Sequence, residues 1–280
     1  MAIYDPKSMK ADEFINNEEI IETIAYAEAN KDNVELIDEL LAKAAPKKSG
    51  NGVTCAGLTH REAAVLLACT IPEKVEQMYK LANEIKLAFY GNRIVMFAPL
   101  YLSNYCVNGC VYCPYHMKNK HIARIKLTQE QIRNEVIALQ DMGHKRLAIE
   151  AGEDPVNNPI EYILECIKTI YSVHHKNGDI RRVNVNIAAT TVENYRKLKE
   201  AGIGTYILSQ ETYNKKSYLE LHPTGPKHDY DYHTEAMDRA MEGGIDDVGL
   251  GVLFGLEGYM YEFAGLLMHA EHLEAVHGVG

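Results

Sequence analysis

The chain has 280 residues, of which 46% are hydrophobic and 24% are charged, and its formal net charge is −10. This composition indicates a globular protein, and the acidic balance argues against a nucleic-acid partner, which needs a basic face. No apolar run reaches the roughly 18 residues of a membrane span. The first residues also lack the apolar segment of a secretory signal. We therefore expect a cytoplasmic protein without a membrane partner.

The first 90 residues are predicted to form a helical extension. Apolar residues recur at helical spacing over residues 34–41. The segment 45–52 is rich in Pro, Gly, Ser and Lys and is expected to be a linker. Thr59 and Glu62 have the spacing of a helix capping box ahead of an apolar stretch. A further helix is expected over residues 72–89.

From residue 91 onward the pattern changes to strand-like runs, each followed by a helix-like segment. Thr128 with Gln131, and Thr190 with Glu193, have the spacing of helix caps within this region. Five runs rich in Val, Ile and Leu are expected to be strands, at residues 94–98, 146–151, 183–188, 205–209 and 248–254.

Strands that alternate with helices indicate a parallel sheet with helices on its outer face. Right-handed crossovers then favour a barrel or a doubly wound sheet. No G-x-G-x-x-G sequence follows the first strand, which disfavours a dinucleotide-binding fold. We predict an α/β fold of the TIM-type (β/α) barrel class over residues 91–280, with residues 1–90 as its N-terminal helical extension. A complete barrel has eight units, so we expect this one to be truncated after about five.

Three of the six cysteines lie within eight residues, in the spacing C-x3-C-x2-C, directly after the first predicted strand. These are Cys106, Cys110 and Cys113. Iron–sulfur clusters are normally held by four thiolates. Three thiolates on one 4Fe-4S cluster would leave one iron open, much as a catalytic zinc keeps an open position. The scattered cysteines are expected to be small buried hydrophobic side chains: Cys55, Cys69 and Cys166.

A zinc site is the alternative interpretation of this loop. Together with His116, the three clustered cysteines have the composition of a closed Cys3His site. A loop at the carboxyl end of a barrel strand is, however, where such folds place their active sites. That position favours the open cluster. Analysis of iron and sulfide distinguishes a 4Fe-4S cluster from a zinc site.

The longer sequence runs resemble the radical S-adenosylmethionine (SAM) tyrosine lyases. The cysteine spacing, with the aromatic Tyr112 before the last cysteine, looks like the radical SAM signature. The family of FeFe-hydrogenase maturases called HydG is similar over several runs, and Cys-Pro-Tyr-His at residues 113–116 favours it over 2-iminoacetate synthase of thiamine biosynthesis. The runs that carry the resemblance are MFAPLYLSNYCVNGCVYCPYH, EAGEDP, NIAATTVENYRKLKEAGIGTY, QETY and LHPTGPKHDY.

The resemblance implies cofactor-binding roles for particular residues. SAM would bind the open iron through its amino and carboxylate groups. Gly152 and Glu153, which follow Ala151, stand where the family has a Gly-Gly-Glu sequence that receives the SAM ammonium group. Glu211 stands where relatives bind the ribose or methionyl part, and His233 where several carry an arginine for the SAM carboxylate. The backbone carbonyl beside Tyr112 would meet the adenine. Simple turn, packing or surface roles remain the alternatives for these residues.

The resemblance also implies a reaction and partners. Members cleave the Cα–Cβ bond of L-tyrosine to p-cresol and dehydroglycine, with electrons from a donor such as ferredoxin or flavodoxin. In HydG, dehydroglycine then yields CO and cyanide on a second, C-terminal iron–sulfur cluster, and other hydrogenase maturases use these products. The cysteines of that second cluster are absent from this sequence. We therefore expect the chain to bind the first cluster and part of SAM, with little product formation. The alternatives are 2-iminoacetate synthase and a non-catalytic zinc-binding domain.

Overall fold

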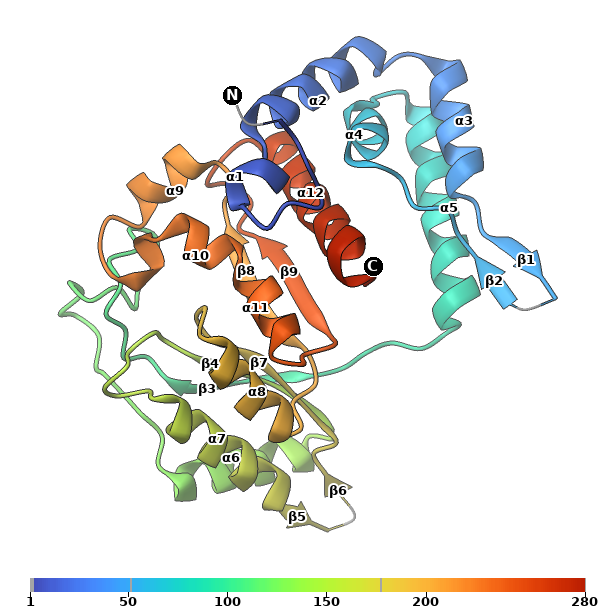
Figure 1. Ribbon diagram of the computed structural model, residues 1–280. Coiled ribbons are helices and arrows are strands. Elements are labelled where there is room, and N and C mark those ends of the chain that lie inside the picture. Colours follow the sequence, from blue (N-terminus) through green and yellow to red (C-terminus); the bar gives the residue numbers. More distant parts are fainter. Residues whose placement is uncertain (1–2, 51, 177, 280) are drawn as a thin grey trace. The chain divides into compact units, whose positions relative to one another are not determined.

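The computed structural model describes residues 3–50, 52–176 and 178–279. The chain divides into two compact units (Figure 1). The first comprises Met1–Val95 and Glu257–Gly280, and the second comprises Met96–Leu256. The predicted domain division at residue 90 stays a prediction. Across the described ranges, no helix is long and apolar enough to cross a membrane.

The first unit is helical, and its core is built on the apolar stripe that the sequence predicts. Ile37 and Leu40 are buried together with Val65. The capping box of Thr59 and Glu62 is present at the start of α4. The helices are α1 (Ala11–Phe14), α2 (Asn17–Asn30), α3 (Val34–Ala44), α4 (His60–Ala68), α5 (Pro72–Tyr90) and α12 (Tyr259–His277).

The predicted linker at residues 45–52 is wrong where the chain forms strands, at residues 47–49 and 52. Strand β1 (Lys47–Ser49) pairs antiparallel with β2 (Gly52–Thr54) to form a short hairpin. Pairing satisfies the backbone N–H and C=O groups that an open linker would leave to water. The expected burial of the scattered cysteines holds for Cys69 and Cys166, whereas Cys55 is only partly buried. The Cys55 thiol instead donates to the carbonyl oxygen of Ala44 at 2.5 Å.

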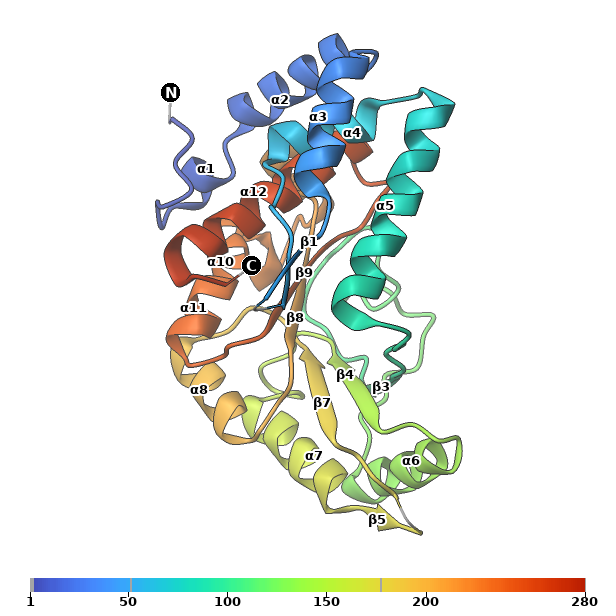
Figure 2. The ribbon, with the colours of Figure 1, turned by 90° about the vertical axis from the view of Figure 1, so that its right-hand side faces the viewer.

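The second unit is built on a five-stranded sheet, in the order β3-β4-β7-β8-β9, in which every neighbouring pair is parallel. Helices α6, α7 and α8 lie along one face of this sheet (Figure 2). The arrangement is that of a partial (β/α) barrel, as predicted. Its strands are β3 (Ala98–Ser103), β4 (Arg146–Ala151), β7 (Arg182–Asn186), β8 (Tyr206–Glu211) and β9 (Val248–Val252).

Each connection between these strands contains at least one helix. The helices that follow the first four strands are α6 (Gln129–Asp141), α7 (Ile160–Ser172), α8 (Val192–Glu200), α9 (Lys215–Leu221), α10 (Tyr230–Thr234) and α11 (Ala236–Glu242), with the 3-10 turn η1 (Pro226–His228) between α9 and α10. A two-residue hairpin, β5 (His174–His175) with β6 (Gly178–Asp179), precedes β7. Thr128 caps α6 as predicted. The cap of α8 is Thr191 rather than Thr190, because the side chain of Thr191 accepts the N–H of Asn194.

The first strand lies four residues later than predicted. The sequence predicts a strand over residues 94–98, yet residues 94–97 lie outside β3, and Ile94 is 82% exposed and Phe97 is 55% exposed. Strand β3 begins at Ala98 and includes Pro99, whose missing N–H is tolerated because β3 is the edge strand next to β4 in the described sheet. The other four strands differ from their predicted bounds by at most two residues at either end. The cysteine loop still follows the first strand directly.

Candidate active site

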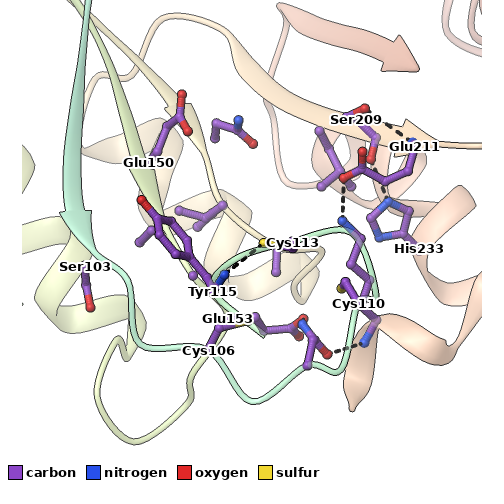
Figure 3. Close-up of a pocket in the computed structure, with 18 of the residues that line it drawn as sticks. Ser103, Cys106, Cys110, Cys113, Tyr115, Glu150, Glu153, Ser209, Glu211 and His233 are labelled. Atoms are coloured by element: carbon purple, nitrogen blue, oxygen red, sulfur yellow. Dashed lines mark hydrogen bonds and ion pairs between the residues drawn. The ribbon is translucent and has the colours of Figure 1, made fainter. Parts of the chain in front are cut away.

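A cavity of about 230 Å³ opens at the carboxyl ends of the parallel strands in the second unit. The three clustered cysteines line it together with residues that follow β4 and β8 (Figure 3). Parallel α/β folds bind their ligands at this end of the sheet, because the strand-to-helix loops converge there. The cavity is therefore the candidate active site.

The cysteine loop is closed at its base by backbone and side-chain hydrogen bonds. Ser103 at the end of β3 forms an isolated bridge with Lys126. The guanidinium of Arg124 donates to the carbonyl oxygens of Asn104 at 2.6 Å and Tyr115 at 2.8 Å. It also donates to the carbonyl of His116 at 2.9 Å. One side chain thus joins the residues on both sides of the cysteines and fixes the path of the loop.

The loop also packs closely on the segment after β4. A Cβ atom at Gly152 would lie 2.4 Å from the carbonyl oxygen of Tyr105 and 3.0 Å from the Cβ of Cys106. Only glycine allows this approach of the two backbones. The backbone N–H of Val107 donates to the carbonyl of Glu153 at 2.8 Å, which completes the contact. The predicted Ala-Gly-Glu sequence is therefore in contact with the cysteine loop.

Asn108, inside the cysteine loop, links two further walls of the cavity. Its side chain is buried, and its amide N–H donates to the carboxylate of Glu153 at 2.6 Å. Its carbonyl oxygen accepts the backbone N–H of Lys227 at 3.0 Å. Burial raises the pKa of Glu153, while the Asn108 hydrogen bond and the Lys227 charge act in the opposite direction. Both ends of one amide therefore hold the loop against β4 and η1.

Glu211 ends β8 in an unusual backbone conformation. Its φ of 68° lies in the left-handed region, and the pairing of β8 with β9 shifts register between Ser209 and Glu211. Such a conformation in a non-glycine residue costs of order 1 kcal/mol or more and is typical of functional sites. The carboxylate accepts a hydrogen bond from the Lys227 ammonium group at 2.6 Å, with 16% and 17% of the two side chains exposed. The bulge thus aims Glu211 at the cavity and the lysine holds it there.

Two buried histidines beside the cavity are neutral. Burial lowers the pKa of His222 to about 4 and that of His233 to about 3. Nδ1 of His222 lies 2.7 Å from the Tyr218 carbonyl oxygen, so it carries the proton, and Nε2 accepts the Tyr112 hydroxyl at 2.7 Å. By the same argument, Nε2 of His233 donates to the Ser209 carbonyl at 2.9 Å. A carboxylate ligand would then meet a lone pair at Nδ1 of His233, so this tautomer disfavours the predicted SAM carboxylate role.

The cavity suits positively charged ligands. Three carboxyl groups line it against one lysine, and its histidine is neutral. Burial raises the pKa of the Cys110 thiol to about 11 and also raises that of Cys113. Bound iron would offset this cost, because metal ions deprotonate the thiols that coordinate them. Among the described residues, no three His, Cys, Asp or Glu side chains are gathered to hold a single metal ion.

The eight residues predicted to hold the cluster or SAM all line this cavity: Cys106, Cys110, Cys113, Tyr112, Gly152, Glu153, Glu211 and His233. His116 is not among the residues that line it. A simple turn role is the alternative that the sequence leaves for Glu153. In the structure Asp154 caps this turn, because its carboxylate accepts the backbone N–H groups of Val156 and Asn157. Sequence reasoning missed Asn108 and Lys227, although both stand in runs that carry the resemblance.

The fold and the cysteine loop agree with the comparison of the chain with protein families. The model of the radical SAM superfamily matches residues 100–267, and the chain belongs to this superfamily. Membership implies a 4Fe-4S cluster and SAM as cofactors. The three thiols of one loop are a donor set that fits such a cluster.

Among solved structures, a crystal structure of HydG, a maturase of the FeFe-hydrogenase, is 57% identical, with a TM-score of 0.87. The match covers 95% of this chain and 56% of that one. HydG from Carboxydothermus hydrogenoformans is 38% identical, with a TM-score of 0.83 over 96% of this chain and 60% of that one. The 2-iminoacetate synthase of Salmonella typhimurium is 30% identical over 73% of this chain and 52% of its own length. The chain thus spans about half the length of these relatives.

Proposed function

We propose that this protein is a radical SAM lyase that cleaves the Cα–Cβ bond of L-tyrosine to p-cresol and dehydroglycine. In this proposal dehydroglycine leads to CO and cyanide for assembly of the FeFe-hydrogenase H-cluster, and other hydrogenase maturases are partners. The proposal is carried by one observation. The three cysteines line a cavity at the strand ends of a chain that is 57% identical to HydG over 95% of its length.

The residues of the cavity divide into three proposed tasks. Cys106, Cys110 and Cys113 hold the cluster, and a ferredoxin or flavodoxin reduces it. Gly152 and Glu153 receive the SAM ammonium group, which the Glu153 carboxylate suits because it lines the cavity. Glu211 orients the ribose or methionyl part, and the cluster and SAM together supply a deoxyadenosyl radical.

The test is an anaerobic assay after reconstitution with iron and sulfide. The protein is expressed from its complete reading frame and is given SAM, dithionite and L-tyrosine. We expect p-cresol together with 5′-deoxyadenosine, and neither product from the variant Cys110→Ala. SAM cleavage without p-cresol under these conditions would refute the tyrosine lyase activity.

A second candidate function is 2-iminoacetate synthase, which the 30% identity to the Salmonella typhimurium enzyme favours. That enzyme class would give p-cresol and dehydroglycine without CO or cyanide. Trapping CO with deoxyhaemoglobin in the same assay separates the two functions. Metal analysis addresses the zinc-binding alternative, because stoichiometric zinc without iron after reconstitution would exclude a radical SAM enzyme altogether.

A further inference from the structure

A row of polar side chains crosses the sheet below the cysteine loop. Tyr101 on β3 is paired with Glu150 on β4, and Glu150 is paired with Asn186 on β7. Directly paired residues point to the same face of a sheet, and all three line the cavity. The interior layers of (β/α) barrels are normally filled by branched apolar side chains. This polar layer in the cavity is therefore a candidate site for a polar group of the ligand.

Glu150 differs from the other two carboxylates of the cavity in its partners. Glu153 is bound by Asn108, and Glu211 is bound by Lys227. In the described parts of the chain, Glu150 forms no ion pair with a lysine, arginine or histidine. Its side-chain partner is the Tyr101 hydroxyl, which forms a hydrogen bond with it. Burial raises the pKa of Glu150, because a carboxylate loses hydration there. A cation placed against it would offset that cost.

We propose that this row is the subsite for the α-amino group of the substrate, with the Glu150 carboxylate accepting its N–H groups. The inference rests on the proposed function and deepens it, since the family reaction starts at the amino group. A phenol would leave the charge of Glu150 uncompensated, whereas an ammonium group neutralises it. The SAM ammonium group is proposed to lie against Glu153, near the cysteines, and Glu150 stands apart from them at the other end of the cavity (Figure 3).

The main test replaces the charge and keeps the size of the side chain. Reconstituted Glu150→Gln protein is compared with the wild type for its KM for tyrosine in the p-cresol assay. It is also compared for tyrosine binding by equilibrium dialysis in the presence of SAM. Loss of one charge-assisted contact corresponds to about a 10- to 100-fold weaker interaction. We expect KM and the dialysis Kd to rise by that factor, and Glu150→Asp, which keeps the charge, to recover part of the loss.

An analogue without the amino group tests the chemistry of the subsite. The inhibition constant of 3-(4-hydroxyphenyl)propionate should be the same for wild type and Glu150→Gln, because the analogue has no group for Glu150 to bind. An equal loss for tyrosine and the analogue would show a general distortion of the cavity and overturn the proposal. The matched control is Glu161→Gln on α7, whose side chain is 70% exposed; its KM should equal that of the wild type.

The two proposals fail in different ways. Wild-type protein that neither binds tyrosine nor makes p-cresol would refute the proposed function. Wild-type protein that makes p-cresol, while a folded Glu150→Gln variant keeps the same KM and Kd, would refute the amino-group subsite and leave the lyase intact. Thermal unfolding of each variant verifies that it is folded.

Discussion

At the scale of single residues, Arg124 holds the two sides of the cysteine loop together. It is half-buried, and its partners are backbone carbonyl oxygens on both sides of the cysteines. The planar fork of a guanidinium can serve several carbonyls at once, whereas a lysine ammonium is a compact point charge on a flexible stem. Arg124 is thus a positioning residue that acts through the loop.

We predict that Arg124→Lys destabilises the cysteine loop although it keeps the charge. The loss of two or more charged hydrogen bonds should reduce the free energy of unfolding by about 1.5–3 kcal/mol. The variant should retain less than the full complement of iron after reconstitution and desalting, measured against protein concentration. The control is Arg133→Lys on the exposed side of α6. Equal iron content and equal stability in the two variants would contradict a positioning role for Arg124.

The residues of the site fall into two groups by how far the sequence could reveal them. The cysteines, Gly152 and Glu153 stand at fixed short spacings, so a local pattern indicates them. Asn108 could not be inferred in this way, because its partners Glu153 and Lys227 lie 45 and 119 residues away. Such contacts exist only once the loops after different strands have converged.

At the scale of elements, the sequence predicted four strands closely and misplaced the first. The run at residues 94–97 is continuously apolar, and periodicity cannot tell a buried strand from an exposed apolar segment. The actual strand β3 alternates buried and exposed residues and contains Pro99, which local propensity counts against a strand. Pairing with β4 decides the outcome, and that partner lies more than forty residues further along the chain.

The contact between the cysteine loop and the end of β4 gives a second prediction. In Gly152→Ala the new Cβ meets the backbone carbonyl of Tyr105, which cannot rotate away, so the loop must move. Overpacking of this kind costs about 1–3 kcal/mol. We expect a lower melting temperature in calorimetry and a larger Kd for SAM than in the wild type. Gly251→Ala on β9 is the matched control, because its Cβ would make ordinary contacts with Ser209 at 3.7 Å and beyond. A SAM affinity that is unchanged in Gly152→Ala would disprove the close approach.

At the scale of the whole molecule, the first unit joins the two ends of the chain around one buried histidine. Nδ1 of His60 on α4 lies 2.7 Å from the carboxylate of Glu271 on α12, and Nε2 lies 2.9 Å from Glu19 on α2. Tyr4 donates to Glu271 at 2.6 Å, and Arg61 forms two hydrogen bonds with Glu19. These partners come from positions 4 to 271, so a sequence pattern could not indicate the cluster.

This cluster predicts how the stability of the first unit depends on pH. Burial alone lowers the pKa of His60, but the hydrogen bonds and charges of Glu271 and Glu19 outweigh it and raise that pKa above its usual value of 6.5. A raised histidine pKa contributes stability that is complete below about pH 6.5 and is lost as the pH rises through the folded-state pKa. Burial raises the pKa of both glutamates. The hydrogen bonds and charges of Arg61 and His60 outweigh burial at Glu19, and the hydrogen bonds of His60 and Tyr4 outweigh it at Glu271. Both pKa values are therefore lowered below 4.5, and their contribution is lost as the pH falls through the folded-state values.

The first unit should therefore be most stable between about pH 4.5 and 6.5, and its melting temperature should fall on both sides of that window. In His60→Gln the decrease on the basic side should disappear, because a neutral amide does not titrate. The melting temperature at pH 5.5 should also be lower, since the amide cannot bind both carboxylates with a positive charge. Calorimetry of both proteins from pH 4 to 9 makes the comparison. A wild-type profile that is flat between pH 6 and 9 would show that His60 is not charged between its two carboxylates. The ends of the chain would then be joined by neutral hydrogen bonds, and the first unit would depend on its apolar core.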